Sequence, residues 1–148
     1  ISQDLIDAYV IVNRIRFITE LNKEIPSNKK IILPLHTLSP DMRVSIDKRQ
    51  ILNYGCNISS GTFEAEENHC VIPYELAIAY ALAIVSIGKA KNIDLFGFDG
   101  FDAMDPRQSE MLKLFELFNS YYSSKVPLIS LTKTNYPIVK RTLHDPSI

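Results

Sequence analysis

Short apolar runs alternate along the chain with longer stretches in which apolar residues recur at helical spacing. Runs with β-strand character stand at residues 8–12, 30–33, 50–54, 93–96 and 126–131. Turn-forming residues follow the first four runs and end them, namely Asn13, Pro34, Gly55 and Gly97. Pro127 in the last run indicates an edge position or the start of the strand.

Three segments are predicted to be helices. Residues 14–23 carry an apolar stripe, and residues 25–28 break the helix. Pro73 opens a helix over residues 74–87, where no charge stands between Glu75 and Lys89, and a helix that is apolar on every side is a buried one. Pro106 begins a third helix, over residues 106–122. The stripe residues are Ile15, Ile18 and Leu21 in the first helix and Met111, Leu112, Phe115, Phe118 and Tyr122 in the third.

The remaining segments are polar. Residues 36–49 are predicted to be irregular, and residues 57–69 a loop whose acidic residues Glu64, Glu66 and Glu67 face water. One helical turn is expected near Ile138. Because strand and helix patterns alternate, the expected fold is a single α/β domain. It would be Rossmann-like, with three layers: a mostly parallel sheet and helices on both of its faces.

Charge and composition exclude two classes of partner. The net charge is −1, from 16 basic and 17 acidic residues, so no global basic field would hold a nucleic acid or an anionic membrane. No apolar run approaches the ~20 residues that a membrane span needs.

Two cysteines, Cys56 and Cys70, are too few for a disulfide scaffold. Reduced thiols and a cytoplasmic location are expected, and a single disulfide bridge is left open.

No complete catalytic signature is present. The chain contains no phosphate-binding Gly-x-x-x-x-Gly-Lys loop, no Gly-x-Ser-x-Gly elbow and no full Gly-x-Gly-x-x-Gly fingerprint. The histidines at 36, 69 and 144 are too far apart for metal-ligand spacing. His69 and Cys70 are adjacent, but neighbours on an extended chain point to opposite sides. No catalytic or metal-binding residue is therefore predicted, and the cofactor is unknown.

Polar residues gather at the predicted strand ends. In a doubly wound sheet, Asn13, Asn53-Tyr54, residues 97–100 and residues 132–135 would share one rim, where ligands collect. Arginines after Asn13 could pair with a phosphate, and Asn68 comes just before the buried helix, whose N-terminus favours anions. The expected ligand is a small anion, a nucleotide or a sugar phosphate. The predicted binding residues are Asn13, Arg14, Asn53, Tyr54, Asn68, Gly97, Asp99 and Gly100.

Asp99 has two interpretations. It either binds ligand hydroxyls at the rim, or it is buried and organises its loop by accepting hydrogen bonds from backbone N–H groups. The second is favoured as the primary role, which leaves Asn13 and Asn53 as the better ligand contacts.

Several short motifs resemble a known family. Tyr-Val-Ile-Val-Asn-Arg-Ile-Arg-Phe within residues 8–17 is similar to the N-x-x-R-[FY] segment of a Rossmann-like domain. That domain follows the barrel of hydroxymethylglutaryl-lyase-like or 4-hydroxy-2-oxovalerate aldolase-like proteins in bacterial surface-polysaccharide pathways. The resemblance spans about residues 8–137. The other matching segments are Ile51 to Tyr54, Asn68, Asp94 to Gly100 and Ser130 to Tyr136.

The resemblance implies an accessory domain that performs no chemistry itself, within an aldolase or lyase that supplies an N-terminal barrel domain. It also implies that the domain's first strand and Gly-containing loop would precede Ile1. Separately, the chain begins Ile-Ser-Gln without methionine, so an excised or processed piece of a longer chain is expected. A homo-oligomer is a further expectation.

Bacterial sialyltransferases and pterin-diphosphokinase-like proteins resemble residues 77–87 and the Gly-x-Asp that follows. This leaves two alternatives. One is a glycosyltransferase with a cytidine-type sugar donor, held by Asn13 and Asn53, in which Asp99 or Asp105 replaces the missing histidine base. The other is a non-catalytic oligomerisation domain.

Overall fold

The computed structural model describes residues 2–20, 25–44, 46 and 50–141. Its helices are α1 (Arg14–Glu20), α2 (Pro40–Val44), α3 (Ala77–Ile87) and α4 (Pro106–Tyr122), with 3-10 helices η1 (Gln3–Leu5) and η2 (Leu35–Thr37). Its strands are β1 (Ala8–Val10), β2 (Lys30–Leu33), β3 (Ile51–Asn53), β4 (Gly55–Ile58), β5 (Glu64–Ala65), β6 (His69–Ile72), β7 (Ile93–Leu95), β8 (Leu128–Ser130) and β9 (Val139–Lys140).

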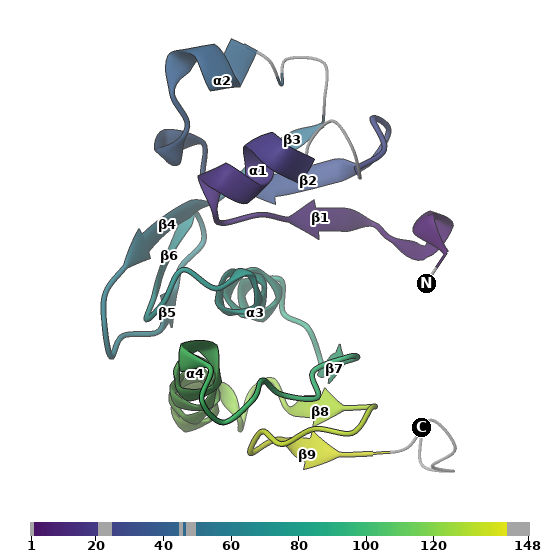
Figure 1. Cartoon of the computed structure of the whole chain (residues 1–148), viewed down its shortest axis with the longest axis vertical. Coiled ribbons are helices and arrows are strands. Elements are labelled where there is room, and N and C mark those ends of the chain that lie inside the picture. The colour runs from purple at the N-terminus through teal and green to yellow at the C-terminus, as the bar shows by residue number, and fades with distance from the viewer. Residues whose placement is uncertain (1, 21–24, 45, 47–49, 142–148) are drawn as a thin grey trace.

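The described strands form three small sheets (Figure 1). The order β1-β2-β3 is parallel throughout, as is β7-β8-β9. In the third sheet β4 and β6 are parallel, and β5 is antiparallel to β6. The predicted α/β class with mostly parallel strands is therefore confirmed. The strands lie in three short sheets, where the sequence predicted one continuous sheet.

Helix α3 lies at the centre of the molecule, between the sheet of β1 and the sheet of β7 (Figure 1). It contacts β1, β5 and β6. Ala79, Tyr80, Leu82 and Ala83 are buried, and the small alanines let neighbouring strands approach closely. Its other residues are half-buried apart from the exposed Ala77, so the predicted burial on every side holds for part of the helix.

Hydrogen bonds from two tyrosine hydroxyls connect α3 to the neighbouring strands. The Tyr80 hydroxyl donates a hydrogen bond to the Tyr54 carbonyl, between β3 and β4. The Tyr54 hydroxyl donates to the carbonyls of Glu66 (2.8 Å) and His69 (3.0 Å), at the turn between β5 and β6. Burial raises the pKa of both phenols, so both remain protonated donors.

Helix α4 covers the other side of this core. Its predicted bounds are confirmed, and Asp105 and Pro106 explain its start as N-cap and first helical residue. Met111, Phe115 and Phe118 are buried as predicted, and Leu114 is buried while Leu112 is only partly so. Phe63 packs edge-on against Phe118, with 5.5 Å between ring centroids.

Three local predictions were wrong, and one of the two interpretations of Pro127 was correct. Residues 57–69 contain strand β5, the end of β4 and the start of β6. Both β4 and β5 pair with β6, so these strands form through non-local pairing and show little local sequence pattern. Residues 36–49 contain α2 and the end of η2. Strand β9 follows Ile138 where a helical turn was expected, because residues 139–140 pair with β8. Pro127 precedes β8, which is a central strand, so its start-of-strand interpretation is the correct one.

The apolar stripe predicted for α1 was also wrong. Ile15 and Ile18 are exposed, at 65% and 55%, whereas Phe17 is buried at 2%. The larger aromatic side chain takes the core position, which turns the two isoleucines outward. Leu21 lies outside the described residues.

The cysteines face each other across β4 and β6. Cys56 and Cys70 are register partners, and both are buried free thiols. A hydrogen bond between the thiols raises the pKa of Cys70 and lowers that of Cys56. His69 is exposed beside the buried Cys70, as predicted for neighbours on a strand. Gly55 suits this position, because a Cβ there would lie only 3.0 Å from the Cβ of His69 and 3.3 Å from the Asn68 carbonyl oxygen.

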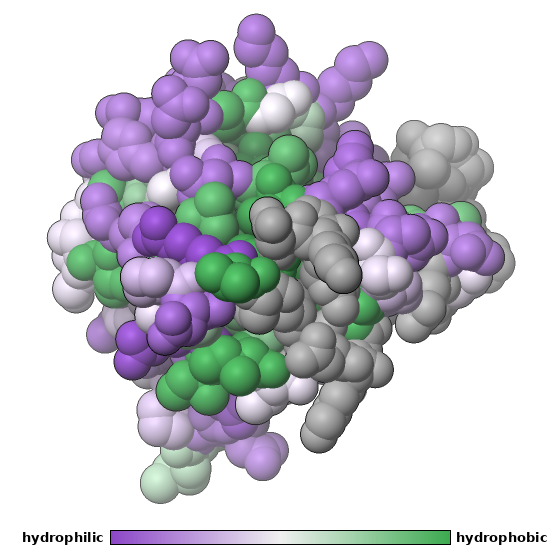
Figure 2. Space-filling model, turned by 90° about the horizontal axis from the view of Figure 1, so that it is seen from above, coloured by the Kyte–Doolittle hydropathy of each residue, from purple (hydrophilic) through white to green (hydrophobic). Residues whose placement is uncertain are grey.

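The surface carries scattered apolar side chains. Figure 2 shows apolar patches between hydrophilic residues on the face seen from above. The exposed acidic residues Glu64, Glu66 and Glu67 confirm the predicted solvated cluster. No helix in the described part of the chain is long and apolar enough to cross a membrane.

Tyr80→Phe tests the tie between α3 and the strands. The change removes one hydroxyl and leaves the Tyr54 carbonyl without its donor in a buried site, so the free energy of unfolding should fall by about 1–3 kcal/mol. Urea denaturation measures it, with Tyr121→Phe on the exposed side of α4 as the matched control. Equal stability of the two variants would contradict the role given to this hydrogen bond.

Candidate functional site

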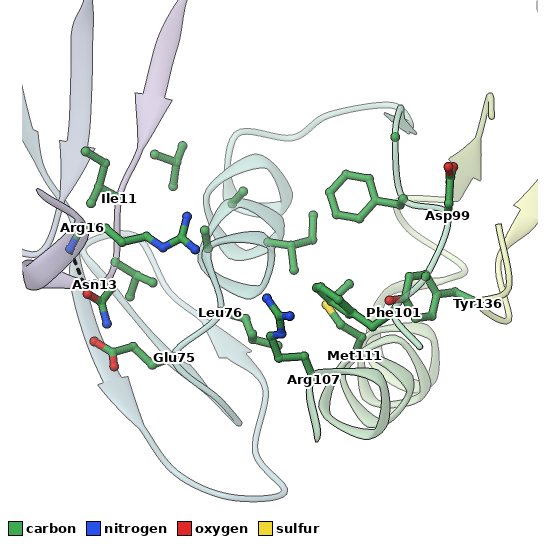
Figure 3. A pocket seen from close by; sticks show the side chains of 18 residues that line it. Ile11, Asn13, Arg16, Glu75, Leu76, Asp99, Phe101, Arg107, Met111 and Tyr136 are labelled. Carbon is green, nitrogen blue, oxygen red and sulfur yellow. Dashed lines mark hydrogen bonds between the residues drawn. The ribbon is translucent and has the colours of Figure 1, made fainter. Parts of the chain in front are cut away.

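A cleft of about 940 Å³ opens between the β1 sheet, α3, α4 and the loop after β7 (Figure 3). Its volume is in the usual range for small-molecule sites. The lining residues are Val10 to Asn13, Arg16, Glu75 to Ile78, Ala81, Gly97 to Phe101, Arg107, Met111 and Tyr136.

Asn13 shapes the first wall of the cleft. Its side-chain oxygen accepts hydrogen bonds from the backbone N–H groups of Ile15 (3.0 Å) and Arg16 (3.1 Å). It is thus the N-cap of α1 and fixes where the chain turns from β1 into that helix. In Figure 3 the Arg16 side chain extends from α1 into the cleft. The cap therefore positions the arginine.

The loop after β7 forms the opposite wall. Gly97 and Gly100 have positive φ angles of 75° and 121°, which side chains disfavour. The Gly97 N–H donates to the Thr132 hydroxyl at 3.0 Å, and the Asn135 N–H donates to the Asp99 carbonyl at 3.0 Å. Residues 132–135 therefore hold this loop, as their predicted place on the same rim implies.

Arg107 is held in a fixed orientation at the start of α4. Its Nε lies 3.0 and 3.1 Å from the two Asp105 carboxylate oxygens, and its Nη2 lies 2.5 Å from one of them. Its guanidinium lies over the Phe101 ring, 4.2 Å from the centroid. Hydrogen bonding to Arg107 lowers the pKa of Asp105, so this carboxylate stays ionised.

The N-terminus of α3 opens at the cleft floor, where Leu76, Ala77 and Ile78 line it. Leu76 is the N-cap and supplies no side-chain acceptor. The first intrahelical bond runs from the Tyr80 N–H to the Leu76 carbonyl, 3.2 Å away, so the amides before Tyr80 have no acceptor within the helix. Such a helix end favours an anion.

The cleft brings together half of the predicted binding residues: Asn13, Gly97, Asp99 and Gly100. Arg14, Asn53, Tyr54 and Asn68 do not line it. The Asn53 side chain instead accepts a hydrogen bond from the Leu35 N–H at 3.0 Å, which ties β3 to η2. Tyr54 is buried in the core, and the Asn68 carbonyl accepts from Gly55. The single rim predicted for all strand ends was therefore wrong for β3, because β3 lies at the opposite edge of its sheet from β1, which borders the cleft.

The buried, loop-organising role predicted for Asp99 was wrong. Its side chain is exposed, and the described residues provide no hydrogen bond to its carboxylate; its backbone carbonyl takes part in the loop instead. In Figure 3 the carboxylate points away from both guanidinium groups. Asp99 lines the cleft together with Asn13, without Asn53.

Sequence reasoning missed the α4 side of the cleft. Phe101, Arg107, Met111 and Tyr136 line it, although none of them stands directly after a predicted strand. The Asp-Pro-Arg sequence at 105–107 marks a capped helix start. In the sequence it puts an arginine shortly after the loop that follows β7. That signal could have identified Arg107.

The lining is chemically suited to binding. Two arginines stand with the exposed carboxylates of Glu75 and Asp99, and apolar side chains form much of the remaining wall. Among the described residues, no cysteine, histidine or serine lines the cleft. Nowhere in the described part of the chain do His, Cys, Asp and Glu side chains group as a metal site requires.

Comparison with protein-family models, curated proteins and solved structures found no significant match to this chain.

Asn13→Ala separates the capping role from a ligand role. Losing the cap should lower the free energy of unfolding by about 0.5–2 kcal/mol, whereas Asn13→Asp retains an acceptor and should be close to neutral.

Asp99→Asn should leave stability unchanged, because the carboxylate is exposed. Thermal and urea denaturation measure all three. Strong destabilisation by Asp99→Asn would restore the loop-organising role.

Proposed function

We propose that this chain is a Rossmann-like accessory domain of an aldolase-type protein in sugar or polysaccharide biosynthesis, and that its cleft binds a nucleotide or sugar phosphate. The observation that carries the binding part is the convergence of Arg16 and the uncapped N-terminus of α3 on one cleft. Positive charge and free backbone amides are the groups that recognise phosphate. The position after parallel strands β1 and β7 agrees with ligand sites in open α/β sheets.

The aldolase context rests on the resemblance of the short motifs. It is tested by the full-length gene product, in which a barrel domain should precede this chain. A product without a barrel would remove the parent enzyme from the proposal and leave the binding part standing.

Arg16→Gln is expected to weaken phosphate binding. A charge-assisted hydrogen bond contributes about 1.5–3 kcal/mol, so affinity should fall about tenfold or more. Calorimetry against nucleotides and sugar phosphates measures it. Arg14→Gln is the matched control, since it removes the same charge from the same helix but lies outside the cleft lining. Equal losses in both variants would indicate a general electrostatic effect, and no binding by the unaltered protein would refute the proposed site.

Glycosyl transfer from a cytidine-type donor has weaker support. Asn13 lines the cleft, but Asn53 is engaged with Leu35. A general base needs a pKa near the working pH, whereas hydrogen bonds from Arg107 lower the pKa of Asp105. Donor hydrolysis that disappears in Asn13→Ala, with Asn13→Asp as a stability control, would favour transfer over simple binding.

An oligomerisation role is the second candidate, and it is compatible with ligand binding. Ile15 and Ile18 are exposed on α1, and an oligomer could bury these apolar side chains against a second copy of the chain. Light scattering at high protein concentration is expected to give a mass above the 16.8 kDa of one chain, and Ile15→Ser with Ile18→Ser should restore that mass. A monomer at every concentration would exclude this role.

A further inference from the structure

The contacts of Arg107 suit its guanidinium to stacking on a flat ring. Arg107 has its charge compensated by Asp105, through three N–O contacts of 2.5–3.1 Å. Its flat guanidinium also lies on the Phe101 ring. The Asp105 pair and the ring together fix the plane of the guanidinium. Such a group is a weak partner for a further anion but a preformed surface for stacking.

One face of this platform is open to the cleft. The Arg107 side chain is 54% exposed while Phe101 covers its other face. Guanidinium planes stack well on aromatic rings, including nucleobases. Met111 and Tyr136 lie beside the platform in Figure 3 and give this half of the cleft an apolar wall. This half is therefore suited to a flat aromatic group.

The other half of the cleft is suited to phosphate. Arg16 enters from α1, and Figure 3 shows its guanidinium separated from that of Arg107 by the start of α3. The uncapped amides of α3 open on the same floor. A ligand that meets both halves needs an aromatic ring at one end and an anionic group at the other.

Resting on the proposed function, we infer that the ligand is a nucleotide rather than a sugar phosphate alone. Its base stacks on the Arg107–Phe101 platform, and its phosphates lie between Arg16 and the N-terminus of α3. Sugar phosphates share the anionic group but have no flat ring for the platform.

Calorimetry with four probes tests this inference: uridine and adenosine diphosphates, inorganic pyrophosphate and glucose 1-phosphate. The nucleoside diphosphates should bind at least tenfold more tightly than the other two. Arg107→Lys keeps the charge but loses the plane, so it should remove this difference and leave pyrophosphate binding within about twofold. Phe101→Leu should act in the same direction, which protects the test if the lysine variant unfolds. Arg16→Gln should weaken all four probes.

Two outcomes overturn the inference, and they differ in what else they remove. Equal affinity for all four probes, or a nucleotide preference that survives both platform variants, would refute base stacking and leave the anion site of the proposed function intact. Binding of none of the probes would refute the proposed function and the inference with it.

Discussion

Burial of an uncharged helix at the centre of the fold is the constraint on which the rest depends. Helix α3 can be stable only if strands cover its apolar sides, and it contacts β1, β5 and β6. Its polar tie is the Tyr80 hydroxyl on the Tyr54 carbonyl, which sets the position of α3 relative to the β3–β4 junction. Contacts along its sides hold α3 in place, and its N-terminus opens on the cleft between the β1 sheet and the loop after β7.

The cleft follows from this arrangement. The chain leaves β1 at Asn13, which caps α1 and so places Arg16; it leaves β7 at Gly97, where positive φ angles turn the loop toward α4. Asp105 then caps α4 and orients Arg107. At the starts of α1 and α4, the residue that caps the helix also positions a cationic side chain. Structural and binding roles are therefore coupled, and the two arginines are the residues whose substitution separates them most cleanly.

Much of this could be predicted from the sequence where the signal is local. The bounds of α4 follow from Asp-Pro-Arg and a regular apolar stripe, and the glycines after β7 indicated a special loop. Non-local pairing could not be predicted in the same way. Strands β4, β5 and β6 are short and polar on one face. Asn53 was wrongly placed at the site because the local sequence does not show that β2 separates β3 from β1 in the sheet. The Asp-Pro-Arg signal marks Arg107 at the start of α4, but that this helix start borders the cleft depends on packing of α4 beside the β7 loop.

Hydrogen–deuterium exchange with and without a nucleoside diphosphate tests most directly whether the cleft is the functional site. The account predicts slower exchange in the segments that line it, residues 11–17, 76–81 and 97–101, with little change in α2 and β5. Protection confined to other segments, or none at saturating nucleotide, would contradict it.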